Sequence, residues 1–175
     1  MSDPRYPIGK FSPPAAYGPE QRARFIAEIN EAPRRLRAAV EGLTREQLET
    51  PYREGGWTAA QVVHHVPDSH LNSYTRFKLA VTEDAPEIKA YDEAAWARLP
   101  DASDSGSIEV SLALLDTLHA RWVRFLRALE PEQLSRTFRH SELGPVTLDR
   151  TLALYAWHGC HHTAHITTLR ERMGW

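Results

Sequence analysis

Hydrophobic residues recur with helical spacing in four long stretches of the chain. In the first stretch, Phe25, Ile26, Ile29 and Leu36 fall on one face at steps of three, four or seven residues. The same spacing, with polar residues between the apolar ones, returns three more times. The sequence therefore predicts four amphipathic helices, at about 19–40, 59–81, 107–129 and 147–173.

Local signals mark where these helices begin and where they could be interrupted. Pro19 is suited to the first turn of a helix, and Thr58 is a good N-cap for the second long helix. Thr44 and Gln47 have the spacing of a capping box and predict a short helical turn. Pro33 lies inside the first stretch and predicts a kink or a break near residue 30.

The connections between the helices differ in length. Residues 83–106 are polar, contain two prolines and predict a long crossover with a short helix around 92–98. Residues 131–146 predict a connection with a short strand pair. Residues 1–18, rich in Pro, Gly and Tyr, predict an extended arm before one domain at 19–175. We expect an all-α four-helix bundle with one long crossover.

Composition narrows the classes of function. The chain has 21 basic and 23 acidic residues and a net charge of −2, which argues against binding to nucleic acid or an anionic membrane. It has one cysteine, no signal-peptide pattern and no apolar run of about 18 residues. These features lead us to expect a cytoplasmic protein that acts on a small molecule.

Four of the nine histidines lie between residues 158 and 165. At about 100° per residue, His162 lies about 40° from His158, and His165 lies about 20° to the other side. This sector also carries apolar residues, so we expect it to face the bundle interior. His161 falls at the border of the sector, and Cys160 is expected to point outward as a bystander.

The spacing of His158 and His162 is typical of two ligands for one metal ion, because residues i and i+4 are neighbours on a helix. A column of neutral imidazoles in an apolar stripe is unfavourable unless a metal or hydrogen bonds satisfy the nitrogens. The alternative is therefore a set of hydrogen-bonded core histidines. The zinc-peptidase pattern His-Glu-x-x-His is absent, which argues against a peptidase of that type.

The segment HHVPDSH, residues 64–70, offers a third ligand. His65 lies where the apolar face of its helix meets a polar column, His70 is the fallback, and His64 is expected on the outer side. Three neutral imidazoles and a water molecule form the ligand set of an open, catalytic metal site. Zinc, nickel and iron all accept it. Pro67 is expected to bend the helix near this ligand.

Several further side chains could complete a site. Asn72 and Arg76 share the face of His65 and could bind an anionic substrate or cofactor. Tyr155 lies one turn before His158 and could donate a hydrogen bond to a bound group. His119 is either a partner of a metal ligand or a core residue. His161 and His165 are candidate proton relays.

Two long motifs carry a resemblance to a known family. They are GGWTxxxVVHHxxDSHxNSYxRFKL at 55–79 and YxWHxxHHxAHI at 155–166. Together with YPIG at 6–9 and RMGW at 172–175, they resemble the DinB/YfiT-like superfamily, in particular its YfiT branch. The resemblance implies a four-helix bundle, a homodimer, and a metal held by His65, His158 and His162. Pro67 departs from the regular helix of the family and puts the geometry near His65 in question.

The resemblance leaves three functions open. The first is a metal-dependent hydrolase that activates water, and the second is an S-transferase that activates a low-molecular-weight thiol of the bacillithiol type. The third is a non-catalytic metal-binding protein of the stress response, with His165 as a fourth ligand. We expect one divalent cation per chain, zinc first, with nickel or iron as alternatives. The sequence shows no carboxylate that can be placed beside the metal as a base, which weakens hydrolysis slightly.

Overall fold

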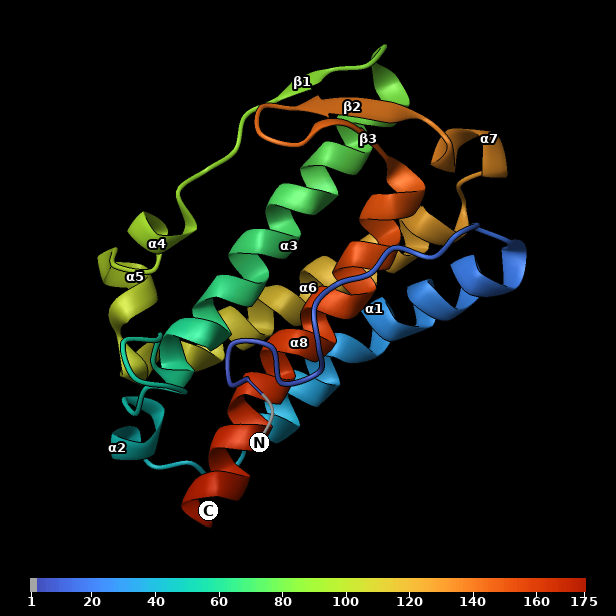
Figure 1. Ribbon diagram of the computed structural model, residues 1–175. Helices are drawn as coiled ribbons and strands as arrows, with labels where there is room; N and C mark the ends of the chain where they lie inside the picture. The colour runs from blue at the N-terminus through green and yellow to red at the C-terminus, as the bar shows by residue number, and fades with distance from the viewer. Residues whose placement is uncertain (1–2) are drawn as a thin grey trace.

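Four long helices form the protein, as the hydrophobic pattern predicts. The computed structural model describes residues 3–175. The long helices are α1 (Pro19–Val40), α3 (Ala59–Thr82), α6 (Ile108–Arg127) and α8 (Leu148–Met173). They pack side by side as a bundle, with the arm before α1 lying along α8 (Figure 1). The expected all-α four-helix bundle is confirmed.

The connections hold several smaller elements. The antiparallel strand pair is confirmed, and β1 adds to it in parallel, so that a three-stranded sheet in the order β1-β2-β3 lies at one end of the bundle (Figure 1). The hydrophobic pattern did not predict β1, α5, the 3-10 helix η1 or α7. The short elements are α2 (Arg45–Leu48), β1 (Glu87–Ile88), α4 (Glu93–Trp96), α5 (Pro100–Ser103), η1 (Ser105–Ser107), α7 (Pro131–Leu134), β2 (Thr137–His140) and β3 (Gly144–Thr147).

The predicted helix starts are correct, whereas the predicted break is wrong. The Thr58 hydroxyl accepts a hydrogen bond from the Gln61 amide at 3.1 Å, and Thr44 and Gln47 form a capping box at α2. Helix α1 runs without a break through Pro33, which is buried in the bundle. Burial of Ala32, Pro33 and Leu36 along one side stabilises the helix against the loss of one backbone hydrogen bond.

The core is divided by a polar layer. One apolar cluster centres on Ile29, Phe77 and Trp122, and a second centres on Leu36, Val63 and Leu115. Along α3, α6 and α8, five buried histidines lie between the residues that belong to these two clusters, and His65 lies at the edge of the second cluster, between Val63 and Val66. The five histidines are His70, His119, His161, His162 and His165. The bundle therefore encloses a layer of imidazoles between two apolar regions.

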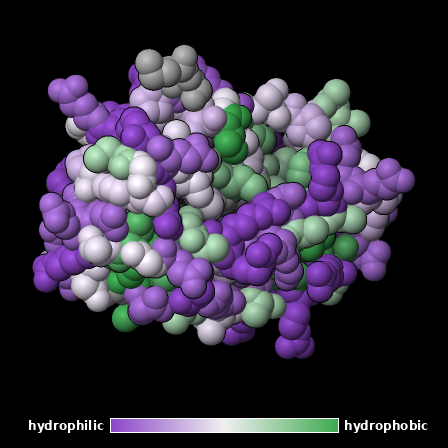
Figure 2. Space-filling model, turned by 90° about the horizontal axis from the view of Figure 1, so that it is seen from below, coloured by the Kyte–Doolittle hydropathy of each residue, from purple (hydrophilic) through white to green (hydrophobic). Residues whose placement is uncertain are grey.

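The surface seen from below the bundle is mostly hydrophilic (Figure 2). Figure 2 shows hydrophilic residues spread over one end of the molecule, with smaller apolar groups between them. Within residues 3–175, no helix is long and apolar enough to cross a membrane.

Candidate metal centre

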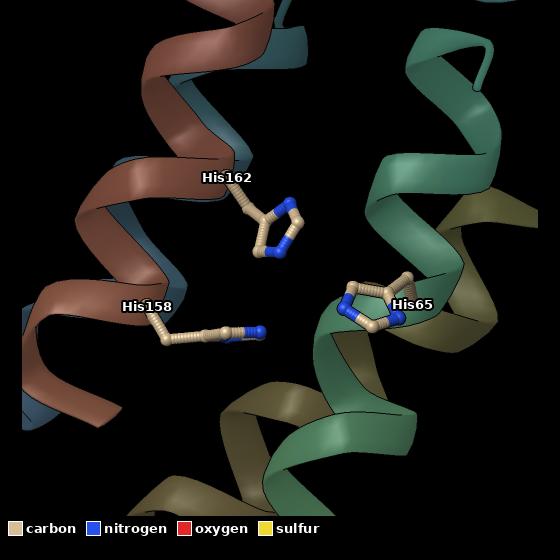
Figure 3. Close-up of side chains that lie close together, drawn as sticks. All are labelled: His65, His158 and His162. Atoms are coloured by element: carbon tan, nitrogen blue, oxygen red, sulfur yellow. The ribbon is translucent and has the colours of Figure 1, made fainter. Parts of the chain in front are cut away.

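Three histidines from two helices converge between α3 and α8. His65 lies on α3, and His158 and His162 lie one turn apart on α8. Their rings point toward one another (Figure 3), and one ligand atom from each lies within 4.8 Å of those of the other two. The ring centroid of His65 is 5.4 Å from that of His158 and 4.7 Å from that of His162. Among residues 3–175, this cluster has the geometry to hold a metal ion.

Helices α1 and α8 approach each other closely at Gly159, next to the ligand His158. A Cβ atom added at Gly159 would lie 3.0 Å from the Cβ of Ala32 on α1, and 3.7 Å from a ring carbon of His70. Any larger residue at 159 would therefore push α8 away from α1. The glycine between His158 and Cys160 was not assigned a role from the sequence, although a glycine inside a helical pattern is a recognisable sign of close packing.

Burial keeps the three imidazoles neutral. It lowers the pKa of His65 to about 4, and it holds the pKa values of His158 and His162 well below the ordinary value of 6.5. The neighbouring imidazoles lower these pKa values further, because two positive rings repel each other. Neutral imidazoles present lone pairs, which is the form that binds a metal ion.

The cluster also contains an imidazole nitrogen without a partner. His162 Nδ1 is buried and has no hydrogen-bond partner among the described residues. An isolated buried nitrogen of this kind is unfavourable unless something binds the ring. Three imidazoles and an open position form the donor set of catalytic zinc and of related divalent cations. The residues therefore fit the cation that the sequence leads us to expect.

Both ring nitrogens of His158 also lie close to polar side chains of the bundle interior. His70, the fallback ligand, lies outside the cluster, and its Nε2 atom is 3.1 Å from His158 Nδ1. The Ser69 hydroxyl lies 3.5 Å from His158 Nε2 and 3.2 Å from the hydroxyl of Tyr155. Tyr155 is thus linked to His158 through Ser69. Burial raises the pKa of Tyr155, so this phenol is protonated at neutral pH and can donate a hydrogen bond.

A cavity of about 460 Å³ opens beside the cluster, and we call it the arm pocket. Residues that line it include Arg5, Tyr52, Arg53, Trp57, His162 and His165. His165 stacks on Tyr52 at 4.1 Å, and its Nε2 atom lies 3.3 Å from the backbone oxygen of Arg5. His165 therefore faces the arm and the loop at 51–56, and it is not part of the cluster of three histidines.

His161 also lines the arm pocket, where it stacks on Trp157 at 4.2 Å. Burial lowers the pKa of His161 to about 4, and it lowers the pKa of His165 as well. The Nδ1 atoms of both rings are buried without a hydrogen-bond partner among the described residues. The structure thus places both candidate proton relays beside the pocket next to His162.

Asn72 and Arg76 occupy other positions. The Asn72 side chain donates a hydrogen bond to the backbone oxygen of Asp68. Arg76 lines a separate cavity of about 570 Å³, together with Tyr91, Glu93 and His140. Ala94 lines both this cavity and the arm pocket, so the crossover lies between them. The arginines that line the arm pocket, Arg5 and Arg53, were not singled out from the sequence.

Of the two residues expected to face outward, His64 contradicts the expectation and Cys160 is only partly exposed. His64 is buried, and its ring nitrogens lie 2.7 Å from the Ser111 hydroxyl and 2.9 Å from the Asp104 backbone oxygen. The reason is that α3 packs on α6 as well as on α8, so it has more than one buried face. Cys160 is half-buried beside α1, and its sulfur accepts a hydrogen bond from Arg35 at 3.2 Å.

Cys160 nevertheless remains unsuited to act as a nucleophile. The thiol donates to Glu28 at 3.5 Å, and Arg35 forms an ion pair with the same carboxylate. Burial and the neighbouring Glu28 carboxylate raise the pKa of the thiol. A thiol with a raised pKa is protonated at neutral pH and reacts slowly.

Known proteins resemble this chain in sequence and in fold. A relative in Bacillus mycoides (strain KBAB4), provisionally named a metal-dependent hydrolase, is 54% identical over the full length of both chains. A relative in Bacillus cereus (strain B4264) with the same provisional name is 53% identical over the full length of both chains. The profile of the DinB superfamily matches residues 28–166.

Solved structures show the same architecture. YfiT from Bacillus subtilis, provisionally described as a metal-dependent hydrolase with an unusual four-helix bundle topology, is 49% identical and superposes with a TM-score of 0.95 over 98% of each chain. The four-helix bundle protein TT2238 is 20% identical, with a TM-score of 0.57 over 88% of this chain and 99% of its own, and shows the fold alone. By its sequence and its fold, the chain belongs to the DinB superfamily.

Proposed function

We propose that the protein is a metal-dependent hydrolase in which His65, His158 and His162 hold one divalent cation, zinc in the first place. One observation carries the proposal: three neutral imidazoles converge within 4.8 Å of one another, and the arm pocket opens beside one of them. A cation held in this way lowers the pKa of a water molecule and polarises the bond to be cleaved. The provisional names of the relatives in Bacillus point in the same direction.

The chain's own residues would supply binding and proton transfer. His161 and His165 line the arm pocket and are neutral at pH 7, so either can accept a proton from the attacking water and return it to the leaving group. The Ser69 hydroxyl lies 3.5 Å from His158 Nε2 and 3.2 Å from the Tyr155 hydroxyl, so these two hydroxyls can orient a polar group bound beside Nε2.

The lining of the arm pocket favours an anionic substrate. Arg53 contributes a positive charge, whereas the guanidinium of Arg5 is already ion-paired with Asp3 at 2.8 Å; none of the described residues that line the pocket is acidic. The Nε atom of Arg53 is buried without a hydrogen-bond partner among the described residues, so part of its hydrogen-bonding capacity is free. A carboxylate or phosphate on the substrate would satisfy this donor, because guanidinium groups bind such anions in a bidentate manner.

A second candidate function follows from the same lining. Because none of the described residues in the cluster or in the lining of the arm pocket is a carboxylate, a reaction that needs no strong base is also favoured. In a thiol S-transferase, the cation would hold a low-molecular-weight thiol as its thiolate, and the arginines would bind the carboxylates of that thiol. The thiolate sulfur would then form a bond to an electrophilic carbon and displace its leaving group.

Metal analysis tests the shared part of both functions. We expect about one divalent cation per chain in untagged wild-type protein purified without added metal, and a background level in the variant His158→Ala. The variant His64→Ala is the matched control, because His64 is a buried histidine of α3 outside the cluster. Absence of stoichiometric metal from wild-type protein kept away from chelators would refute the proposal.

Activity assays then separate the two functions. A hydrolase releases 4-nitrophenol from 4-nitrophenyl esters or phosphates without any thiol. A transferase consumes thiol only when an electrophile such as 1-chloro-2,4-dinitrobenzene is present. Metal-loaded protein that does neither, across broad panels of both substrate types, would favour a non-catalytic metal-binding role. The homodimer is a separate proposal, which light scattering of the purified protein tests directly.

A further inference from the structure

A chain of hydrogen bonds extends from His158 through the whole bundle, and we call it the histidine relay. His158 Nδ1 lies 3.1 Å from His70 Nε2, and His70 Nδ1 lies 2.8 Å from His119 Nε2. His119 Nδ1 in turn lies 2.6 Å from the backbone oxygen of Ile29. The four groups come from α8, α3, α6 and α1, so each long helix contributes one member.

The members of the relay are neutral and shielded from water. His70 is 0% exposed and His119 is 2% exposed, and no carboxylate takes part in the chain of bonds. Burial lowers the pKa of His119 to about 4 and holds the pKa of His70 well below its ordinary value. A neutral imidazole has one N–H donor and one lone pair, so each ring donates from one nitrogen and accepts at the other.

The backbone oxygen at the end of the relay sets the direction of every bond. A carbonyl oxygen can only accept, so His119 must carry its proton on Nδ1, and its Nε2 atom is a lone pair. His70 must then donate from Nδ1 and accept at Nε2. His158 must therefore donate from Nδ1, which leaves its Nε2 atom as a lone pair.

We propose that Ile29 O, His119 and His70 are positioning groups that fix His158 in its Nδ1–H tautomer and so keep Nε2 available as a metal ligand. The proposal rests on the proposed function in one respect, namely that His158 binds a cation. Reversing any bond of the relay would set two donors or two lone pairs against each other in a buried environment. The donated hydrogen bond also makes the His158 ring more basic and holds its orientation.

The tautomers can be measured without any metal. Long-range ¹H–¹⁵N correlation spectra of ¹⁵N-labelled wild-type protein in EDTA report which nitrogen of each ring carries the proton. We expect His70, His119 and His158 all to be protonated at Nδ1, which is the less populated tautomer of the free side chain in water. Protonation of His158 at Nε2 in this sample would overturn the proposal, whether or not the protein binds metal.

Metal affinity is the second readout. His119→Leu removes the acceptor for His70, and we expect it to weaken Zn²⁺ binding by about 10- to 100-fold, the usual effect of losing an outer partner of a ligand. His119→Gln can still accept from His70 and donate to Ile29 O, so we expect a smaller loss. His64→Asn is the control for a general loss of stability, since His64 is buried on α3 but bonds to Ser111.

The outcomes separate this inference from the proposed function. Unchanged Zn²⁺ affinity in folded His119→Leu would overturn the relay as a positioning device. Failure of wild-type protein itself to bind Zn²⁺ would refute the proposed function and, with it, the ligand role of Nε2. In that case the tautomer spectra alone would still decide whether the relay sets the protonation of His158.

Discussion

Histidines lie on both sides of His158, and the two groups differ in whether their ring nitrogens have hydrogen-bond partners. On the interior side, His70 and His119 use both ring nitrogens in the histidine relay. On the pocket side, the Nδ1 atoms of His161, His162 and His165 are buried without a partner among the described residues. The satisfied rings link the four long helices, whereas the unsatisfied rings lie beside the arm pocket. Burial alone therefore does not distinguish a structural histidine from a functional one.

The largest effect that we expect comes from breaking the satisfied side. In metal-free protein, His119→Leu leaves Ile29 O and the Nδ1–H of His70 without partners in the core. Losing these bonds should lower the free energy of unfolding by about 3 kcal/mol, which a domain of ordinary stability survives. Urea denaturation in EDTA, followed by tryptophan fluorescence, measures the change.

The matched comparison for this prediction lies on the pocket side. His161→Leu removes a ring whose Nδ1 atom has no partner to lose among the described residues. We expect a much smaller change in the free energy of unfolding than for His119→Leu. Equal losses in the two variants would show that the relay bonds contribute no more to stability than ordinary packing.

Acid should lower the stability of the metal-free protein, because His119 is buried in its neutral form. Burial lowers the pKa of His119 to about 4 from the ordinary value of 6.5. Between these values the unfolded chain binds a proton at His119 that the folded chain excludes, so stability falls as the pH falls from about 6.5 to 4. Full protonation in the unfolded state corresponds to at most about 3 kcal/mol from this residue.

The groups around His119 define the control for the acid effect. His70 on α3 and Ile29 O on α1 contact the ring, and Asp116 on the same helix acts in the opposite direction by raising the pKa of His119. His119→Gln removes the titrating group and keeps an acceptor and a donor. We expect metal-free His119→Gln to lose less stability than wild type between pH 6.5 and 4. Equal losses of stability in wild type and His119→Gln over this pH range would show that protonation of His119 does not cause the acid effect.

The sequence located the cluster better than its surroundings. Helical spacing alone placed His158 and His162 on one inward face, and the family resemblance narrowed the third position to His65, which the structure brings beside them. The angular positions failed for His64, and in part for Cys160, because a helical wheel divides a helix into one inner and one outer face. Helix α3 packs on both α6 and α8, and α8 packs on α1 as well as α3.

The angular position of a residue on a helix also says nothing about its distance along the axis, as Arg76 shows. Arg76 shares the angular position of His65, yet it follows eleven residues later, which is about 16 Å along a helix axis. The structure accordingly places it in a different cavity. The arm-pocket residues Arg5 and Arg53 come from the arm and a loop, for which periodicity makes no prediction. Contacts between distant segments of this kind require the folded structure.

On the pocket side, Arg53 should determine affinity for anionic substrates. We expect Arg53→Gln to raise KM about tenfold for a substrate with a carboxylate, because one charge-assisted hydrogen bond is lost. The comparison uses 4-nitrophenyl esters with and without a carboxylate, or glutathione and 2-mercaptoethanol, depending on the activity found. The neutral member of each pair should be unaffected. Equal changes for both members would show that Arg53 acts on the structure of the pocket instead.

The smallest effect that we expect is a gain in stability, and it tests the difference between the two sides of His158 most directly. In EDTA, His162→Leu removes a buried nitrogen without a partner and replaces it with an apolar side chain, so we expect the free energy of unfolding to rise by about 1 kcal/mol. In Zn²⁺ at about 100 times its dissociation constant, wild type should gain about 2.7 kcal/mol by binding, and the variant should gain almost none. The order of stability of the two proteins would then reverse on adding metal. A variant less stable than wild type in EDTA would mean that the unpartnered ring contributes to folding without a ligand, and the distinction between the two sides of His158 would fail.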